Sequence, residues 1–448
     1  MRDFDKAVQE KLDKLGKKEF RKPDWRKWLE FTAEEFEDYA ERNTGKSFEE
    51  IENSITEPRS FSISPENFRN SIILHTSGTS GKPKYYLLSE EMLTNNWMPG
   101  MYAIFNSAGL ERRGKVVIFV QERKNREDGI DENGNVVLLS SEFSQRLVVS
   151  MFDADYLIST YPNSRRLDVL SEILGMDKVE VVSAPASTIS RWADINLLSR
   201  GIKEDLKFLD EREISEDFRR ILRKPFERAV KEIHRLLWEK LRSATFIFSF
   251  SSLTENRWRL INSFVKKKCN LYVLSEAGPV ACSFCISDDM FVMPLSIPVI
   301  REDMLPITRT RRDYGELLVT NSERNNVLTG DAVMIEDRNP PKIYREVLRM
   351  PIEIGETNGR KIFAGGYWRE GCEILNTYAI RNAVIDFYSG RIFFDVVNKI
   401  VFVENSPKEV ETALKLKKGK FKLGCDFRVE LGNFEISPRR EWWVYFVC

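Results

Sequence analysis

The chain lacks the features that mark several protein classes. Within its 448 residues no uninterrupted apolar run approaches the roughly 20 residues of a membrane span, and the N-terminus has no apolar signal core. Lys plus Arg and Asp plus Glu both total 69, so net charge gives no argument for a nucleic-acid partner or an anionic membrane surface. We therefore expect a cytoplasmic protein that has neither nucleic acid nor a membrane as its partner.

Glutamine is also scarce, because it occurs only at Gln9, Gln121 and Gln145 in a chain that is 31% charged. A composition rich in Lys, Glu and Arg and poor in amides is typical of proteins from hot environments. The sequence thus favours a thermophilic source.

Cysteine is too sparse for a disulfide framework. There are six in the chain, and Cys372, Cys425 and Cys448 are isolated in sequence, so reduced thiols are expected. Cys269, Cys282 and Cys285 include a Cys-x-x-Cys pair that would hold zinc if a fourth ligand joined it. No second pair or nearby His follows, so buried thiols are the preferred interpretation.

The stretch Thr76 to Lys84, which reads Thr-Ser-Gly-Thr-Ser-Gly-Lys-Pro-Lys, follows the apolar run Ile72-Ile73-Leu74. Its two glycines permit positive φ and close backbone approach, its four hydroxyls donate hydrogen bonds, and its two lysines supply positive charge. These are the groups that bind a polyphosphate. The spacing is not that of a Walker P-loop, because only two residues separate Gly78 from Gly81 and Pro83 follows Lys82.

Strand and helix patterns alternate in the middle of the chain. Apolar periodicity predicts helices near Phe143–Phe152, Arg165–Leu174 and Ile189–Leu198, with strands at Asp155–Ile158 and Val179–Val182 between them. Such alternation predicts a parallel sheet covered by helices. By contrast, Arg123 to Asn135 has the pattern of a charged loop with Asp-Gly and Asn-Gly turns, and we expect no function there.

A chain of this length is expected to form two unequal domains. Residues 1–60 are charged and helix-prone and predict a helical cap on a large domain that spans 1–355. Gly355 to Gly359 is rich in turn residues and predicts a hinge, after which residues 356–448 form a small α+β domain. The fold class expected is therefore α/β, with a large domain of helix-covered sheets and a small mobile C-terminal domain.

The Thr76–Lys84 string resembles the phosphate-binding loop of the adenylate-forming superfamily, whose members activate carboxylates with ATP. Leu274-Ser275-Glu276-Ala277-Gly278-Pro279, Ser159–Asn163, Ser183–Ser187 and Gly315-Glu316-Leu317 resemble, in the same order, segments of its phenylacetate-CoA ligase-like branch. The resemblance covers most of residues 70 to 335. It implies an AMP-forming ligase that makes an acyl-adenylate and then transfers the acyl or aryl group to coenzyme A.

The resemblance also implies roles for particular residues. The β- and γ-phosphates of ATP would lie against the loop, Ser275 would contact the α-phosphate, Glu276 would bind Mg²⁺, and Asp331 would accept hydrogen bonds from the ribose. Tyr272 would lie flat near the adenine, unless it is simply a core residue. The loop residues concerned are Thr76, Ser77, Gly78, Thr79, Ser80, Gly81 and Lys82, with Lys84 and Glu276 as catalytic groups.

The chain departs from the family pattern at three places, the first of which is the hinge, where Glu356 and Asn358 stand in place of the expected Arg and acidic residue. Ser249-Phe250-Ser251-Ser252 stands where a Gly-rich adenine-contacting turn is expected, and Ser437-Pro438-Arg439-Arg440 stands near the expected catalytic Lys. Arg439 and Arg440 are the candidate cations for the reacting centre. Two alternative functions stay open: transfer to an amine, protein thiol or cofactor in place of coenzyme A, and a degenerate nucleotide-binding homologue. The oligomeric state is also open, with a homodimer among the states considered. The carboxylate itself is not identified.

Overall fold

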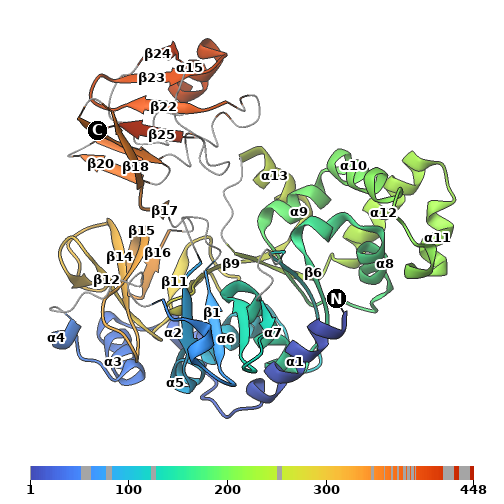
Figure 1. The fold of residues 1–448 in the computed structure, drawn as a ribbon, viewed down its shortest axis with the longest axis horizontal. Helices are drawn as coiled ribbons and strands as arrows, with labels where there is room; N and C mark the ends of the chain where they lie inside the picture. The colour runs from blue at the N-terminus through green and yellow to red at the C-terminus, as the bar shows by residue number, and fades with distance from the viewer. Residues whose placement is uncertain are drawn as a thin grey trace. The chain divides into compact units, whose positions relative to one another are not determined.

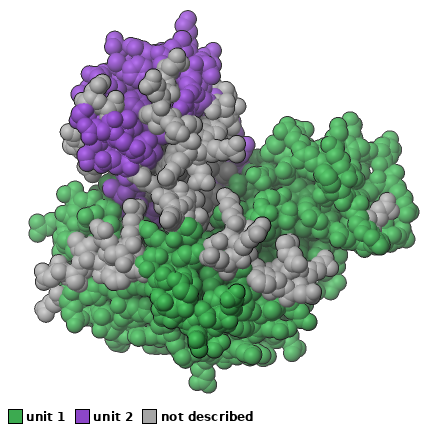
Figure 2. All heavy atoms as spheres, viewed as in Figure 1, with its two compact units in different colours: residues 1–251, 259–329, 334–345 green, residues 252–258, 330–333, 346–448 purple. Residues whose placement is uncertain are grey.

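The computed structural model describes most of the chain in two compact units, which are coloured separately in Figure 2. The larger unit comprises residues 1–251, 259–329 and 334–345, and the smaller comprises 252–258, 330–333 and 346–448. The residues described are 2–51, 62–76, 83–122, 128–249, 255–344, 348–357, 359–364, 367–370, 373–376, 380, 384, 388, 390–416, 428–432 and 444–447.

Helices make up the start of the chain and the segments between the strands (Figure 1). The α-helices up to residue 152 are α1 (Arg2–Gly16), α2 (Trp25–Trp28), α3 (Ala33–Thr44), α4 (Phe48–Ile51), α5 (Glu90–Met92), α6 (Met98–Ser107) and α7 (Ser140–Phe152). Those that follow are α8 (Leu167–Gly175), α9 (Ala186–Ala193), α10 (Ile195–Asp205), α11 (Glu216–Leu222), α12 (Phe226–Lys240), α13 (Glu255–Phe264) and α15 (Pro407–Leu416). Short helical turns are η2 (Pro65–Asn67), η3 (Leu93–Trp97), η4 (Tyr161–Arg165) and η5 (Glu211–Glu213).

The large sheet of the bigger unit contains the parallel layer that the sequence predicts. Strands β9 (Lys267–Leu274), β8 (Thr245–Ser249), β7 (Val181–Ser183), β3 (Lys115–Val120) and β6 (Asp155–Thr160) lie side by side in that order and all run parallel. Figure 1 shows α8, α9, α10, α11 and α12 gathered beside the β6 end of these strands. The prediction of a parallel sheet covered by helices is therefore confirmed.

Beyond β9 the same sheet continues in antiparallel pairs. The order runs β9, β10 (Gly278–Cys282), β11 (Met290–Val292), β16 (Pro341–Ile343), β15 (Val327–Arg338), β14 (Tyr314–Thr320), β12 (Ile297–Ile300) and β13 (Leu305–Pro306). Strand β17 (Leu348–Arg349) pairs with β15. Because β9 and β10 are joined by the short turn Ser275–Ala277, the change from parallel to antiparallel pairing takes place at that turn.

A separate sheet carries the small-residue loop. Its order is β2 (Tyr85–Leu88), β1 (Ile72–His75), β5 (Val136–Leu139) and β4 (Gly129–Ile130), with β1 antiparallel to β2 and parallel to β5. Its apolar side chains join those of α1, η3, α6 and α7 in one buried cluster that includes Leu12, Leu74, Trp97, Leu138 and Phe143. This core fixes the ends of β1 and β5. The expectation of a loop throughout 123–135 is wrong at Gly129–Ile130, which form β4.

The smaller unit has its own sheet and its own core. The order is β18 (Ile352–Thr357), β19 (Arg360–Ala364), β25 (Val444–Val447), β22 (Ile392–Asp395), β23 (Ile400–Val403) and β24 (Arg428–Leu431), beside the hairpin β20 (Tyr367–Glu370) and β21 (Glu373–Asn376). Val410 and Leu414 of α15 are buried with Val401, Val403 and Phe446. The unit is an α+β structure, and the mixed α/β class expected for the whole chain is confirmed.

One ion pair within the smaller unit gives a test of its stability. Arg360 donates to both oxygens of Asp395 at 3.1 and 2.7 Å, and the backbone N–H and side-chain amide of Asn398 donate to the same carboxylate. These hydrogen bonds, led by that of Arg360, lower the pKa of Asp395 from 3.8 to about 2. Stability from this carboxylate is thus present above about pH 4 and is lost as pH falls through about 2.

We expect Asp395→Asn to destabilise the smaller unit by about 1.5–3 kcal/mol, the contribution of a hydrogen bond to a charged group. Protection of the β22 and β23 amides against hydrogen exchange at pH 7 measures this loss. Asp177→Asn is the control, because Asp177 is 93% exposed in its ion pair with Lys115. Equal protection in both variants would contradict a stabilising role for Asp395.

Candidate functional site

The base of the small-residue loop is closed by Thr76 and Lys84. The Thr76 N–H donates to the Lys84 carbonyl at 3.1 Å, and the Lys84 N–H donates to Thr76 Oγ1 at 3.2 Å. These bonds continue the β1–β2 ladder, whose last pair is His75 and Tyr85. The loop therefore starts and ends at the carboxyl end of β1, as its position after an apolar run predicts.

Two serines bring the ends of different sheets together. His75 is level with Leu139 in the parallel β1–β5 pair, so Thr76 and Ser140 leave the sheet at the same edge. Ser140 begins α7, and its hydroxyl lies 2.7 Å from that of Ser275, which follows β9. This contact joins the edge of the four-stranded sheet to the β9–β10 turn. Polar residues at the carboxyl ends of strands are where open α/β sheets bind ligands.

Glu276 is next in that turn and is half-buried. The Tyr86 hydroxyl of β2 donates to Glu276 Oε1 at 3.4 Å, and the Asn321 side-chain amide donates to the Glu276 carbonyl at 3.3 Å. The guanidinium of Arg324 lies 5.5 Å from the centre of the Tyr86 ring. Glu276 is thus held between the loop-bearing sheet and the segment after β14.

Gly278 gives the turn its shape. Its φ is +79°, and a Cβ at this position would lie 1.9 Å from Asn96 Oδ1. No side chain fits there without movement of Asn96, which is only 2% exposed and lies in the π-helical turn η3. Glycine is therefore required both by the backbone angle and by space.

Tyr272 and Asp331 are both buried, at 6% and 7% exposure. Tyr272 lies on β9 opposite Ala281 of β10. Asp331 lies on the part of β15 that belongs to the smaller unit, where it pairs with Arg349 of β17. Their roles toward adenine and ribose stay predictions, as does the role of Ser275 toward the α-phosphate.

Several predicted site residues lie outside the described part of the chain. They are Ser77, Gly78, Thr79, Ser80, Gly81 and Lys82 of the loop, and Arg439 and Arg440 near the C-terminus. Phe250, Ser251 and Ser252 of the expected adenine turn are also outside it, whereas Ser249 ends β8. Of the two loop lysines, the described one is Lys84.

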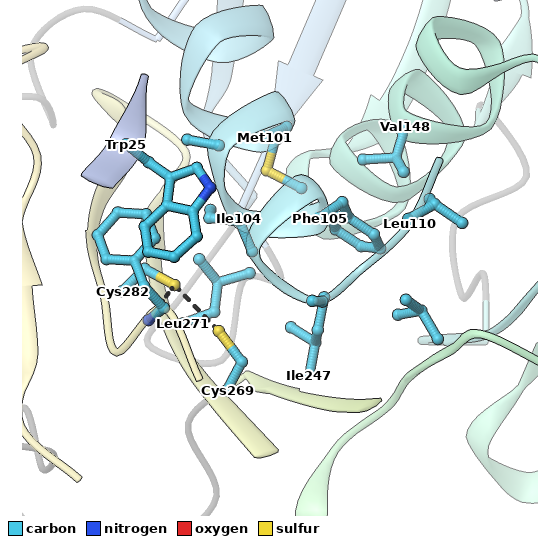
Figure 3. Close-up of a cluster of buried hydrophobic side chains, with 14 of the residues drawn as sticks. Trp25, Met101, Ile104, Phe105, Leu110, Val148, Ile247, Cys269, Leu271 and Cys282 are labelled. Atoms are coloured by element: carbon cyan, nitrogen blue, oxygen red, sulfur yellow. Dashed lines mark hydrogen bonds between the residues drawn. The ribbon is translucent and has the colours of Figure 1, made fainter. Parts of the chain in front are cut away.

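Cys269 and Cys282 are fully buried as free thiols on β9 and β10 (Figure 3). Their sulfurs are 3.1 Å apart, within a cluster that includes Trp25, Met101 and Leu271. Two thiolates on one tetrahedral zinc would be about 3.8 Å apart, given zinc–sulfur bonds of about 2.3 Å. Burial and the neighbouring Cys269 sulfur raise the pKa of Cys282, which keeps it a thiol. We therefore do not assign zinc to Cys269, Cys282 and Cys285.

The role predicted for Glu276 is to hold Mg²⁺ beside a nucleotide. No group of three or more His, Cys, Asp or Glu side chains in the described residues is arranged to hold a metal ion by itself. Mg²⁺ usually takes only one or two carboxylates and completes its shell with phosphates and water. Glu276, which follows Ser275 in the turn, is one half-buried carboxylate, and its role toward Mg²⁺ stays a prediction.

Sequence reasoning missed Ser140, Tyr86 and Asn321. A signal existed for Ser140, because it follows the buried run Val136–Leu139 as Thr76 follows Ile72–His75, at the end of a strand that is parallel to β1. Tyr86 reads as an ordinary strand residue. The contacts that Tyr86 and Asn321 make with Glu276 span 190 and 45 residues, so no local pattern indicates them.

The comparisons with known proteins find similar structures but no sequence relatives. No protein-family model and no curated protein matches the chain. An open conformation of 2-hydroxyisobutyryl-CoA ligase, in complex with 2-HIB-AMP and CoA, is 14% identical with a TM-score of 0.49; the match covers 98% of this chain and 91% of that one. O-succinylbenzoate coenzyme A synthetase from Bacillus subtilis, in complex with ATP and magnesium ion, is 10% identical with a TM-score of 0.48; the match covers 80% and 66%.

A further structure, a malonyl-CoA ligase in a ternary product complex with methylmalonyl-CoA and AMP, is 11% identical with a TM-score of 0.38. That match covers 82% of this chain and 71% of the other. None of the described helices has the length and apolar character of a membrane crossing.

Proposed function

We propose that the protein is an ATP-dependent, AMP-forming ligase that activates a carboxylate as its acyl-adenylate and then transfers the acyl group to coenzyme A. One observation carries the proposal: the base of the Thr76–Lys84 loop and the Ser275–Glu276 turn share one region through the Ser140–Ser275 contact. A polyphosphate loop and an acidic turn are what Mg²⁺–ATP requires.

The roles follow the chemistry of adenylation. A carboxylate oxygen attacks the α-phosphorus and pyrophosphate leaves, so the loop with Lys82 and Lys84 would hold the leaving phosphates. Ser275 would donate to the α-phosphate, and Glu276 would hold the Mg²⁺ that neutralises phosphate charge. Tyr272 would contact adenine, Asp331 the ribose, and Arg439 or Arg440 the reacting centre.

Carboxylate-dependent release of pyrophosphate tests this function. Aryl, fatty and amino acids are screened with ATP and Mg²⁺, and active acids are then assayed for AMP and a coenzyme A thioester. Pyrophosphate release without a thioester would direct the search to an amine, a protein thiol or a cofactor as acceptor. Nucleotide binding with no release for any acid would favour a degenerate homologue, a reading that the Arg439-Arg440 pair in place of the expected Lys supports.

The loop lysines give a prediction on nucleotide use. We expect Lys82→Ala and Lys84→Ala each to weaken ATP use about tenfold to a hundredfold, because each removes a charge-assisted contact of roughly 1.5–3 kcal/mol. The control is Lys178→Ala, which removes an exposed lysine that is paired with Glu180. Unchanged ATP affinity and kinetics in both loop variants would remove this loop from the site.

A further inference from the structure

His75 and Asp128 form a buried pair directly behind the loop base. His75 is one of two histidines in the chain and is the last residue of β1, immediately before Thr76. Asp128 directly precedes β4. The two residues are only 4% and 6% exposed, and Nε2 of His75 lies 2.8 Å from Oδ1 of Asp128.

Both ring nitrogens of His75 face hydrogen-bond acceptors, a backbone carbonyl and a carboxylate. Nδ1 lies 2.9 Å from the carbonyl of Thr76, and Nε2 faces the Asp128 carboxylate at ion-pair distance, without the alignment of a hydrogen bond. A neutral imidazole carries one N–H, so it would leave one nitrogen lone pair against an oxygen lone pair. Only the imidazolium makes both contacts attractive.

The surroundings of the ring are mostly acidic. Besides Asp128, Glu142 of α7 acts on it, although Glu142 is itself paired with Arg146 at 2.8 Å. The Tyr85 ring of β2 lies 5.5 Å from the imidazole between ring centres. Burial lowers the pKa of His75, but Asp128, the Thr76 carbonyl and Glu142 together raise it by more than burial lowers it. The pKa of His75 is therefore above the usual 6.5.

We propose that His75 is a positioning residue which, as an imidazolium between the Thr76 carbonyl and the Asp128 carboxylate, fixes the loop base and makes nucleotide binding depend on pH. The nucleotide part rests on the function proposed above. Thr76 is then held on three sides, because its N–H and Oγ1 already bond to Lys84. Loss of one proton leaves a single N–H on the ring, so either the Thr76 carbonyl or the buried Asp128 carboxylate then faces a nitrogen lone pair.

The first test is a pH titration of both histidines in nucleotide-free protein, labelled with ¹⁵N at histidine and assigned with His234→Gln. We expect the His75 pKa to be above 6.5 and both of its ring nitrogens to carry protons at neutral pH. His234, on α12, serves as the internal reference, because burial lowers its pKa below 6.5. A His75 pKa at or below 6.5 overturns the proposal, and this measurement needs no variant of the pair.

Variants of the partner then test the cause. Asp128→Asn keeps the shape and removes the charge, so the His75 pKa should fall by more than one unit, whereas Asp128→Glu should keep it above 6.5. Asp177→Asn removes an exposed carboxylate from the ion pair with Lys115 and should leave the His75 pKa unchanged. An equal His75 pKa in Asp128→Asn and wild type overturns the role of Asp128.

The loop base is tested by hydrogen exchange of the Thr76 and Lys84 amides. In wild type their protection should fall as pH rises through the His75 pKa, after correction for the intrinsic rate, and in His75→Gln it should be low throughout. Amides of β3, such as Val117, should keep their protection in both proteins. If the protection of the Thr76 and Lys84 amides in wild type does not change with pH, the positioning role of His75 is overturned, whether or not the protein binds a nucleotide.

The last experiment measures steady-state kinetics with ATP and a carboxylic acid that the screen has shown to be a substrate. The wild-type KM for ATP should rise about tenfold as pH passes the His75 pKa, while His75→Gln should have a raised KM that is flat over the same range and a kcat within about twofold of wild type. Parallel wild-type and His75→Gln profiles overturn the link to nucleotide. If the protein neither binds nor turns over ATP, the proposed function and the dependence of nucleotide binding on His75 are both overturned. The titration and exchange experiments still show whether His75 is an imidazolium and whether it orders the loop base.

Discussion

Replacing Glu276 with Gln is expected to lower Mg²⁺-dependent adenylation by about 10²–10³, the usual loss when one preorganised electrostatic group of an active site is removed. Gln has nearly the same shape but lacks the negative charge that a hard divalent cation prefers. Glu276 is half-buried and accepts a long 3.4 Å hydrogen bond from Tyr86, which the side-chain oxygen of Gln can also accept, so the fold should survive. The measurement is the rate of pyrophosphate release as a function of Mg²⁺ concentration.

Two further variants separate charge from packing at this position. Glu276→Asp keeps the charge on a shorter side chain and should restore part of the rate. Tyr86→Phe removes the hydroxyl that touches the Glu276 carboxylate but leaves the carboxylate in place, so its effect should stay within about threefold, as expected for one weak neutral donor. If Glu276→Gln kept both its rate and its Mg²⁺ dependence, Glu276 would be a turn residue without a role in catalysis.

The sequence predicts the parts of this site that are local in the chain. Thr76 to Lys84 follows an apolar run that becomes β1, and the Ser275–Glu276 turn follows another that becomes β9. Both patterns need only the alternation of strands, loops and helices. For this reason the parallel layer from β6 to β9 was also predictable.

The contacts between these parts were not predictable, because they depend on how two sheets pack. Ser140 and Ser275 are 135 residues apart and come from different sheets. Asp128 lies in a charged stretch for which no function was expected, yet it is buried against His75. A single acidic residue among other charges carries no sign of burial, so the pair is visible only once β4 has formed beside β5.

The predicted hinge shows a different limit of prediction from the sequence. Gly355 lies within β18, where the pairing with β19 is irregular, and Gly359 follows with φ of +72° before β19 begins. The turn chemistry was therefore recognised, but a β-hairpin and a hinge use the same residues. Movement of residues from 356 onward, and the boundary at 355, remain predictions. A truncation at about residue 355 that still formed adenylate would exclude the C-terminal residues from that step.

Trp192→Ala is expected to destabilise the larger unit by about 3–5 kcal/mol, the cost of removing a large buried aromatic side chain. Trp192, on α9, is fully buried, and its ring packs edge-on against Phe119 of β3 at 5.3 Å. Its indole N–H donates to the carbonyl of Ser164 in η4 at 2.8 Å. Trp192 thus ties the segment after β6 to the helix after β7.

Trp192→Phe separates the hydrogen bond from the packing. It keeps an aromatic ring against Phe119 but leaves the buried Ser164 carbonyl without its donor, so a smaller loss of about 1–3 kcal/mol is expected. Urea unfolding followed by the circular dichroism of the helices measures both variants. If the free energy of unfolding of Trp192→Ala fell by less than about 1 kcal/mol, the core around Trp192 would have closed over the missing ring. Other contacts would then position η4 and α9.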